Sequence, residues 1–212
     1  MKRSQLLCLL AMSFVTFSVN LARADVFKNH FASITVNGKK VGQVHYTARH
    51  DNEGTLQELK TRASLSILGR EVYHHTLHTH EFWKNDELEH LWGKTNENGK
   101  DYQLDLTRKP NGYTGILNKQ PVELPENSFP TAVWHYSITD HSYLFSIPEL
   151  NLLKVRIKKT EDSVRIGKKS LAAEKFEFSG DWNATVWFDH DKQFLKWQYK
   201  VKGRTVIVVL DP

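Results

Sequence analysis

Cysteine is almost absent from this sequence, which has a single one, Cys8, in 212 residues. Cys8 lies in an N-terminal apolar run that we expect to be removed, so the remaining chain has no thiol for disulfides, metal ligation or catalysis. Catalytic motifs are also missing: there is no Gly-x-Ser-x-Gly elbow, no phosphate-binding glycine loop and no His-Glu-x-x-His helix. These absences favour a non-enzymatic binding role, while the question of enzymatic activity stays open.

The N-terminus has the pattern of a secretory signal peptide. Lys2 and Arg3 precede an apolar run, Leu6 to Val19, and small residues stand at Ala22 and Ala24. A membrane-spanning helix needs about 20 apolar residues, and this run is shorter. We therefore predict cleavage after Ala24 and export to the periplasm, with no transmembrane segment in the mature chain. An uncleaved anchor is the alternative.

Excess charge of one sign is also lacking once the leader is set aside. The formal charge of the whole chain is +5, and the leader contributes three basic residues and no acid, which leaves +2. The remaining charges alternate in sign along the chain, which argues against nucleic acid as a partner. We predict one domain over residues 25–212, long enough to bury its own core.

Strand patterns fill most of this domain. The segment Thr55 to Ile67 alternates apolar and polar residues, and the stretch from Val72 to Leu106 divides into three strands at turn residues. Asn37-Gly38 predicts a tight hairpin turn, because both residues adopt positive φ at little cost. The patterns predict an all-β fold with about ten or eleven antiparallel strands in a strongly curved sheet or half-open barrel.

The segment from Pro121 to Pro148 interrupts the strand pattern with four prolines. We expect a short helix at Thr131 to Ile138, one of at most one or two helices in the protein. An adaptor that binds an envelope protein through this segment is one functional hypothesis, and it requires the segment to be exposed.

Short motifs spread over nearly the whole mature chain resemble a family of exported bacterial domains of unknown function. The motifs are Gly38-Lys39-Lys40-Val41-Gly42, Tyr73-His74, Glu81-Phe82-Trp83, Thr95 to Gly99, Gly180-Asp181 and Trp187-Phe188-Asp189. The resemblance implies a curled antiparallel sheet, similar in outline to periplasmic lipoprotein carriers and lipid-binding clams. It implies no activity and no catalytic residues.

Aromatic and aliphatic residues on one face of the predicted strands suggest a ligand cleft. If the sheet curls without closing, six inward side chains would line an apolar cavity, the usual kind of small-molecule site. These are Leu59, Leu65, Tyr102, Leu104, Trp197 and Tyr199. A filled aromatic core would give the same pattern. The favoured ligand is a hydrophobic small molecule or lipid, with no cofactor.

Histidines suggest an alternative, a metal-binding protein or metal-dependent enzyme that holds zinc or copper. His74, His78 and His80 share one face of a strand, and we expect the imidazoles of His78 and His80 about 6 to 7 Å apart. His90 or His45 on a neighbouring strand could supply a further ligand. On the opposite face, Glu81 lies among aromatic residues, which could raise its pKa and let it act as an acid or base. The alternative is a structural role, in which Glu81 accepts hydrogen bonds from a neighbouring strand or pairs with a lysine.

Overall fold

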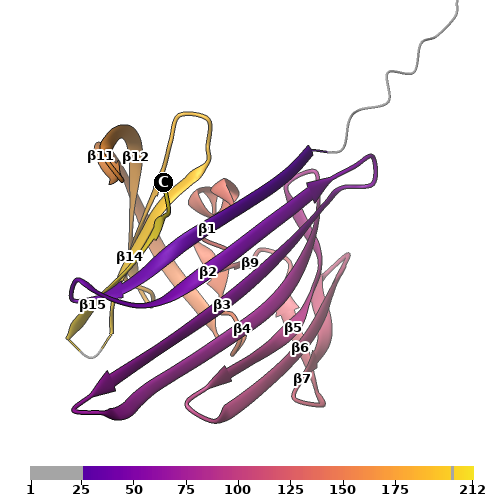
Figure 1. The fold of residues 1–212 in the computed structure, drawn as a ribbon. Helices are drawn as coiled ribbons and strands as arrows, with labels where there is room; N and C mark the ends of the chain where they lie inside the picture. Colours follow the sequence, from indigo (N-terminus) through magenta and orange to yellow (C-terminus); the bar gives the residue numbers. More distant parts are fainter. Residues whose placement is uncertain (1–25, 202) are drawn as a thin grey trace, which may run out of the picture.

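A computed structural model describes residues 26–201 and 203–212, in which fifteen strands form one curled sheet (Figure 1). The expected signal peptide lies outside these residues. The strands are β1 Val26–Val36, β2 Lys39–His50, β3 Thr55–Ile67, β4 Arg70–Lys84, β5 Glu87–Glu97, β6 Lys100–Lys109, β7 Gly112–Leu117, β8 Gln120–Pro125, β9 Phe129–Pro130, β10 Tyr143–Phe145, β11 Leu152–Ile166, β12 Lys169–Gly180, β13 Ala184–Phe188, β14 Phe194–Val201 and β15 Arg204–Leu210.

The sheet is built from two meanders that meet at the N-terminal strand. Strands β1 to β8 follow one another across the sheet, and β15 pairs with the free side of β1, with Ile34 opposite Val208. Strands β15 back to β9 complete the other half, and neighbouring strands are antiparallel except for the parallel pair β9 and β10. The all-β prediction is confirmed, but the expected ten or eleven strands are too few.

Alternating side chains explain the two faces of the sheet. In β6, Tyr102, Leu104 and Leu106 are buried on the concave face while Gln103 and Asp105 are exposed on the convex face. Because one face is buried, the register of each strand is strongly specified. The predicted Asn37-Gly38 turn is present, with φ of 48° and 82° at its two residues.

Residues 126–151 cross the inside of the curl, and we call them the plug segment (Figure 1). They contain β9, β10 and the 3₁₀ helix η1, Tyr136–Asp140. The predicted helix at 131–138 is therefore misplaced. Thr131 accepts a hydrogen bond from the backbone N–H of Ile147 at 3.2 Å instead of capping a helix.

Aromatic contacts hold the plug segment against the concave face. Trp134 stacks on Tyr46 of β2 with ring centroids 5.3 Å apart, and His135 stacks on Trp83 of β4 at 4.0 Å. Phe145 is fully buried. The expectation that the segment from Pro121 to Pro148 is exposed is wrong for most of its apolar side chains, because they are buried inside the sheet.

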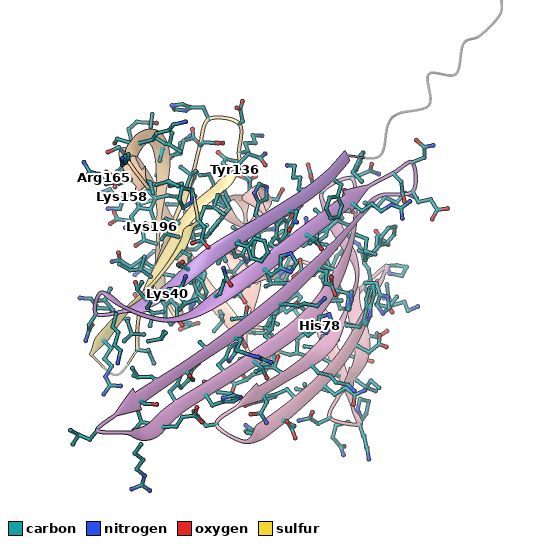
Figure 2. The ribbon with its side chains drawn as sticks, in the orientation of Figure 1. Lys40, His78, Tyr136, Lys158, Arg165 and Lys196 are labelled. Atoms are coloured by element: carbon teal, nitrogen blue, oxygen red, sulfur yellow. The ribbon has the colours of Figure 1, made fainter. Side chains whose placement is uncertain are left out.

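The final strand β15 is covered on both faces, as its apolar residues predict. Val206 and Val208 belong to the main core, while Val209 packs against a smaller cluster on the other face that includes Trp187 and Leu195. Figure 2 shows the side chains of both halves, with His78 on β4 and Lys158 and Arg165 on the β11–β12 hairpin. Among the described residues, no helix has the length and apolar character needed to cross a membrane.

Candidate functional site

An apolar cavity of about 480 Å³ lies inside the curl, beside the plug segment. Its walls come mainly from β1 to β4, β14 and β15, with Glu97 of β5 and Leu153 of β11, and residues 131–134 and 146–148 of the plug segment cover it. Four of the six predicted ligand residues line it: Leu59, Leu65, Trp197 and Tyr199. Trp197 and Tyr199 stack on each other with ring centroids 4.5 Å apart and form one aromatic wall.

The other two predicted residues, Tyr102 and Leu104, face inward but lie outside this cavity. The Tyr102 hydroxyl donates a hydrogen bond to Glu149 of the plug segment at 2.9 Å, and Leu104 is 2% exposed in the core. The plug segment therefore occupies the concave side of β6. The cavity remains where the plug segment does not fill the curl.

One end of the cavity opens at the tips of two hairpins. Leu65 and Val72 flank the β3–β4 turn, and Val201 and Arg204 flank the β14–β15 turn. Val72 and Val201 are 47% and 45% exposed, so the rim presents apolar side chains to solvent. An apolar ligand would enter over this rim with little desolvation of polar groups.

Polar side chains from β4 project into this apolar space. Glu81 is 6% exposed, and its Oε2 accepts a hydrogen bond from the indole N–H of Trp83 at 2.9 Å. Burial raises the pKa of Glu81 to about 7. Within the described structure, the buried atoms His75 Nδ1, Thr79 Oγ1 and Trp197 Nε1 have no hydrogen-bond partner.

Two larger hollows have a different character. One, of about 1000 Å³, is lined by charged side chains that include Lys28, Lys168 and Asp189. The other, of about 1670 Å³, lies over the outward-facing polar side chains of β2 to β6, including Lys60 and Lys94. Apolar lining distinguishes the interior cavity as the candidate small-molecule site.

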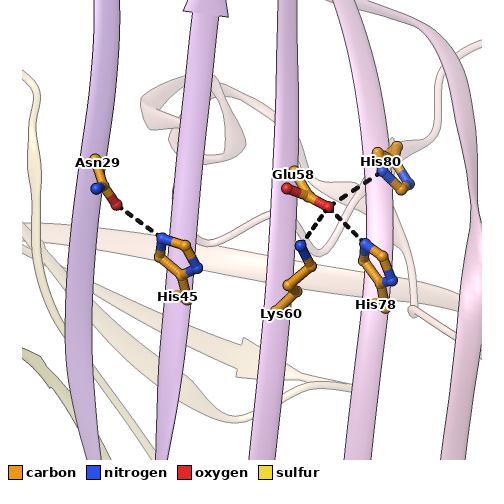
Figure 3. A network of polar contacts seen from close by, with 6 residues as sticks. All are labelled: Asn29, His45, Glu58, Lys60, His78 and His80. Atoms are coloured by element: carbon orange, nitrogen blue, oxygen red, sulfur yellow. Dashed lines mark hydrogen bonds and ion pairs between the residues drawn. The ribbon is translucent and has the colours of Figure 1, made fainter.

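A second candidate site lies on the outer face of β3 and β4, where Glu58 meets two histidines (Figure 3). Glu58 Oε1 is 2.7 Å from His78 Nε2 and 3.4 Å from His80 Nε2. The ligand atoms of the three residues all lie within 4.8 Å of one another. The two imidazole centroids are 4.7 Å apart, closer than expected from strand spacing. Three such donors could bind zinc or copper.

The ammonium of Lys60 also contacts this site, at 2.7 Å from Glu58 Oε1. The hydrogen bond from Lys60, together with that from His78, lowers the pKa of Glu58 to about 2. Burial lowers the pKa of His80, which favours the neutral imidazole that a metal requires. A bound metal ion would have to displace Lys60 from Glu58.

The remaining histidines of the predicted metal set lie elsewhere. His90 contacts Asp105 through Nε2 at 2.8 Å, and the indole of Trp92 stacks on both His80 and His90. His74 is four residues from His78, about 13 Å along an extended strand. Glu58 could not be assigned to this cluster from the sequence, because its proximity to His80 depends on the β3–β4 register, in which the two residues are directly opposite.

These features define a barrel-like antiparallel sheet that curls around its own plug segment and keeps an apolar cavity. The chain belongs to the DUF6134 family, described as a domain of unknown function, whose model matches residues 33–211. The predicted resemblance to a family of unknown function is thereby confirmed. Among curated proteins, none matches the sequence.

The fold is similar to a crystal structure of a β-barrel-like protein of the domain of unknown function DUF1849 from Brucella abortus. The TM-score is 0.61, and the match covers 86% of this chain and 94% of that one. At 9% sequence identity, the similarity concerns the fold alone.

Proposed function

We propose that this chain is an exported periplasmic protein that holds an apolar or lipid-like molecule in its interior cavity. The observation that carries the proposal is the apolar cavity of about 480 Å³ beside the plug segment, a size within the usual range for small-molecule sites. The signal-peptide pattern of residues 1–24 supports export. The apolar rim at Val72 and Val201 supports entry of a hydrophobic ligand.

The free energy of placing an apolar molecule in the cavity supports the same function. Side chains that line an apolar cavity make fewer dispersion contacts than side chains in a filled core. An apolar ligand in the cavity provides these contacts, and its own apolar surface is removed from water. Each 100 Å² of ligand surface transferred from water contributes about 2.5 kcal/mol before the cost of association. An alkyl or aromatic ligand can therefore bind without a large polar contact area.

Native mass spectrometry of the chain, expressed with its leader and purified from periplasm without detergent or chelator, tests this function. A co-purified mass that dissociates on denaturation and is identified as a lipid or other apolar molecule is the expected result. A bare chain mass, together with no saturable binding of the neutral dye N-phenyl-1-naphthylamine, would overturn the proposal.

A Leu59→Trp substitution is expected to weaken dye binding by about tenfold or more, because the indole would occupy the cavity. Leu59 is a partly buried wall residue on β3. The matched control is Leu56→Trp, which makes the same change on the opposite face of β3, where Leu56 is 41% exposed. Fluorescence titration of the three proteins measures the effect. Equal affinities would place dye binding outside the cavity.

We propose zinc or copper binding at Glu58, His78 and His80 as a second candidate function, favoured by their convergence within 4.8 Å. Glu58→Gln or His80→Ala should lower the affinity for Zn²⁺ or Cu²⁺ at least about tenfold, since even indirect support of a ligand is worth that much. Lys60→Met should raise the affinity by freeing Glu58 Oε1. Isothermal titration calorimetry with each metal alone measures these changes.

The controls for the metal experiment are His74→Ala and His90→Ala, which lie outside the cluster. Neither substitution should change the affinity for the metal. If His90→Ala weakens binding as much as His80→Ala, the metal uses another set of ligands and the proposed site is wrong.

A further inference from the structure

The cavity contains a row of polar groups that a purely apolar ligand would leave without partners. His75, Thr79 and Glu81 lie on the inner face of β4 and line the cavity. Thr79 is 1% exposed, and within the described structure its hydroxyl has no hydrogen-bond partner. Buried polar atoms in proteins are usually paired, so each unpaired one needs an explanation such as an absent ligand. The row therefore points to a polar group on the ligand.

Glu81 is the strongest of these groups. The Trp83 indole N–H donates a hydrogen bond to its Oε2, and in the described structure this is the one hydrogen bond that affects the pKa of the carboxyl group. A buried carboxylate is strongly stabilised by a cation that also donates hydrogen bonds. Burial and the Trp83 hydrogen bond are the two causes that shift the pKa of Glu81 in the described structure, and neither is a lysine or an arginine. A ligand with a protonated amine would supply a cation to this carboxylate.

The charges around the cavity also favour a cationic ligand. Among its described lining residues, the charged side chains are Glu81, Glu97 and Arg204. Arg204 and Glu97 lie near the hairpin turns at the open rim, whereas Glu81 is nine residues along β4 from the rim residue Val72, about 30 Å of extended strand. The carboxylate of a fatty acid at the inner end of the cavity would lie next to the carboxylate of Glu81, and the two negative charges would repel each other.

We infer that the cavity binds an amphiphile with a protonated amine, whose ammonium lies between Glu81 and Thr79 while its apolar chain extends toward the rim. This inference rests on the proposed ligand-binding function. Residues two apart on one strand face are separated by about 6 to 7 Å, and an ammonium with three donors can bond both oxygens across that gap. The hydrogen bond from the Trp83 indole orients the Glu81 carboxyl through Oε2, so we expect the ligand ammonium at Oε1.

Three probes with the same twelve-carbon chain test the inference: dodecylamine, dodecanol and dodecanoate. Binding of each to the wild-type protein and to Glu81→Gln is measured by calorimetry below the critical micelle concentration. We expect the amine to bind most tightly and dodecanoate most weakly. Glu81→Gln should lower the affinity for the amine about 30-fold or more and change that for the alcohol less than about threefold. Glutamine can still accept the Trp83 hydrogen bond, so the variant should fold.

Glu123→Gln is the matched control, since it removes the same charge from an exposed position on β8, outside the cavity. It should leave the affinity for the amine unchanged. If dodecanoate binds as tightly as dodecylamine, or if Glu81→Gln binds the amine like the wild type, the inference is overturned while the apolar-ligand function stands. If none of the three probes binds, both the function and the inference fail.

Discussion

Replacing Glu81 with glutamine is expected to stabilise the ligand-free protein by about 3 kcal/mol above about pH 8 and to have little effect below pH 4.5. The carboxyl group is 6% exposed, and burial raises its pKa from 4.5 to about 7. A displacement of one pH unit in pKa corresponds to about 1.4 kcal/mol. The ionised form of Glu81 therefore costs the folded state several kcal/mol.

The direction follows from the protons bound in each state. Between pH 4.5 and about 7, the unfolded chain has lost the Glu81 proton while the folded chain keeps it. The stability that this group contributes is complete below pH 4.5 and is lost as the pH rises through about 7. Glutamine does not ionise, so the stability of the variant does not decrease at high pH through this residue.

The stability of the wild type at different pH values also depends on groups other than Glu81. Burial lowers the pKa of His75 and of His135, the latter to about 4, so these residues reduce stability as the pH falls. The Tyr46 hydroxyl on β2 has a pKa raised by burial first and by the charge of Glu81 second. The difference between Glu81→Gln and wild type at each pH isolates the contribution of Glu81.

Urea unfolding at pH 5, 6, 7 and 8.5 measures this difference. The stabilisation by Glu81→Gln should grow steadily over this range. Glu123→Gln, at an exposed position, should stay within about 0.5 kcal/mol of wild type throughout. A Glu81→Gln protein that is no more stable than wild type at pH 8.5 would show that the ionised carboxylate is already compensated in the ligand-free fold.

The local elements of this fold could be predicted from the sequence, but the closure of the sheet could not. Alternation in Thr55 to Ile67 and the Asn37-Gly38 turn gave correct strands, because side-chain direction and positive φ are local properties. Strands β9 and β10 have two and three residues, too few for a period to appear. They exist because residues 126–151 pack inside the curl, and this packing depends on contacts between distant segments.

The same limit applies to the candidate sites. The inward orientation of Tyr102 was predicted correctly, but its contact with Glu149 depends on the path of the plug segment. The spacing of His78 and His80 is enough to predict that they share one face of a strand. The position of Glu58 beside them depends on the register between β3 and β4. Spacing within one strand is readable in sequence, and pairing between strands is fixed by the whole sheet.

Phe145→Ala is expected to destabilise the protein by about 3 to 5 kcal/mol, because the phenyl ring is fully buried at the junction between the two ends of the sheet. The order of the described strands ends at β8 on one side and at β9 on the other. Phe145 on β10 packs edge-on against Tyr113 of β7, with ring centroids 5.5 Å apart. This contact joins the two ends of the sheet through side chains.

The backbone around Phe145 ties the plug segment to the same junction. Its carbonyl accepts a hydrogen bond from the backbone N–H of Thr131 at 2.9 Å, and in the β10–β11 pair it lies opposite Leu152. Alanine keeps these backbone bonds, so the substitution removes the ring and leaves a cavity. The loss of stability therefore measures how much side-chain packing holds the curl closed.

Tyr143→Ala is the control, since it truncates an aromatic residue on the same strand that is 43% exposed. It should cost less than about 1 kcal/mol, because its ring loses little buried area. Midpoints of urea unfolding for the two variants and the wild type give the comparison. Equal costs for Phe145→Ala and Tyr143→Ala would mean that the ends of the sheet are held by the strand pairing of β9 to β11, and that the Phe145 ring has no part in closing the curl.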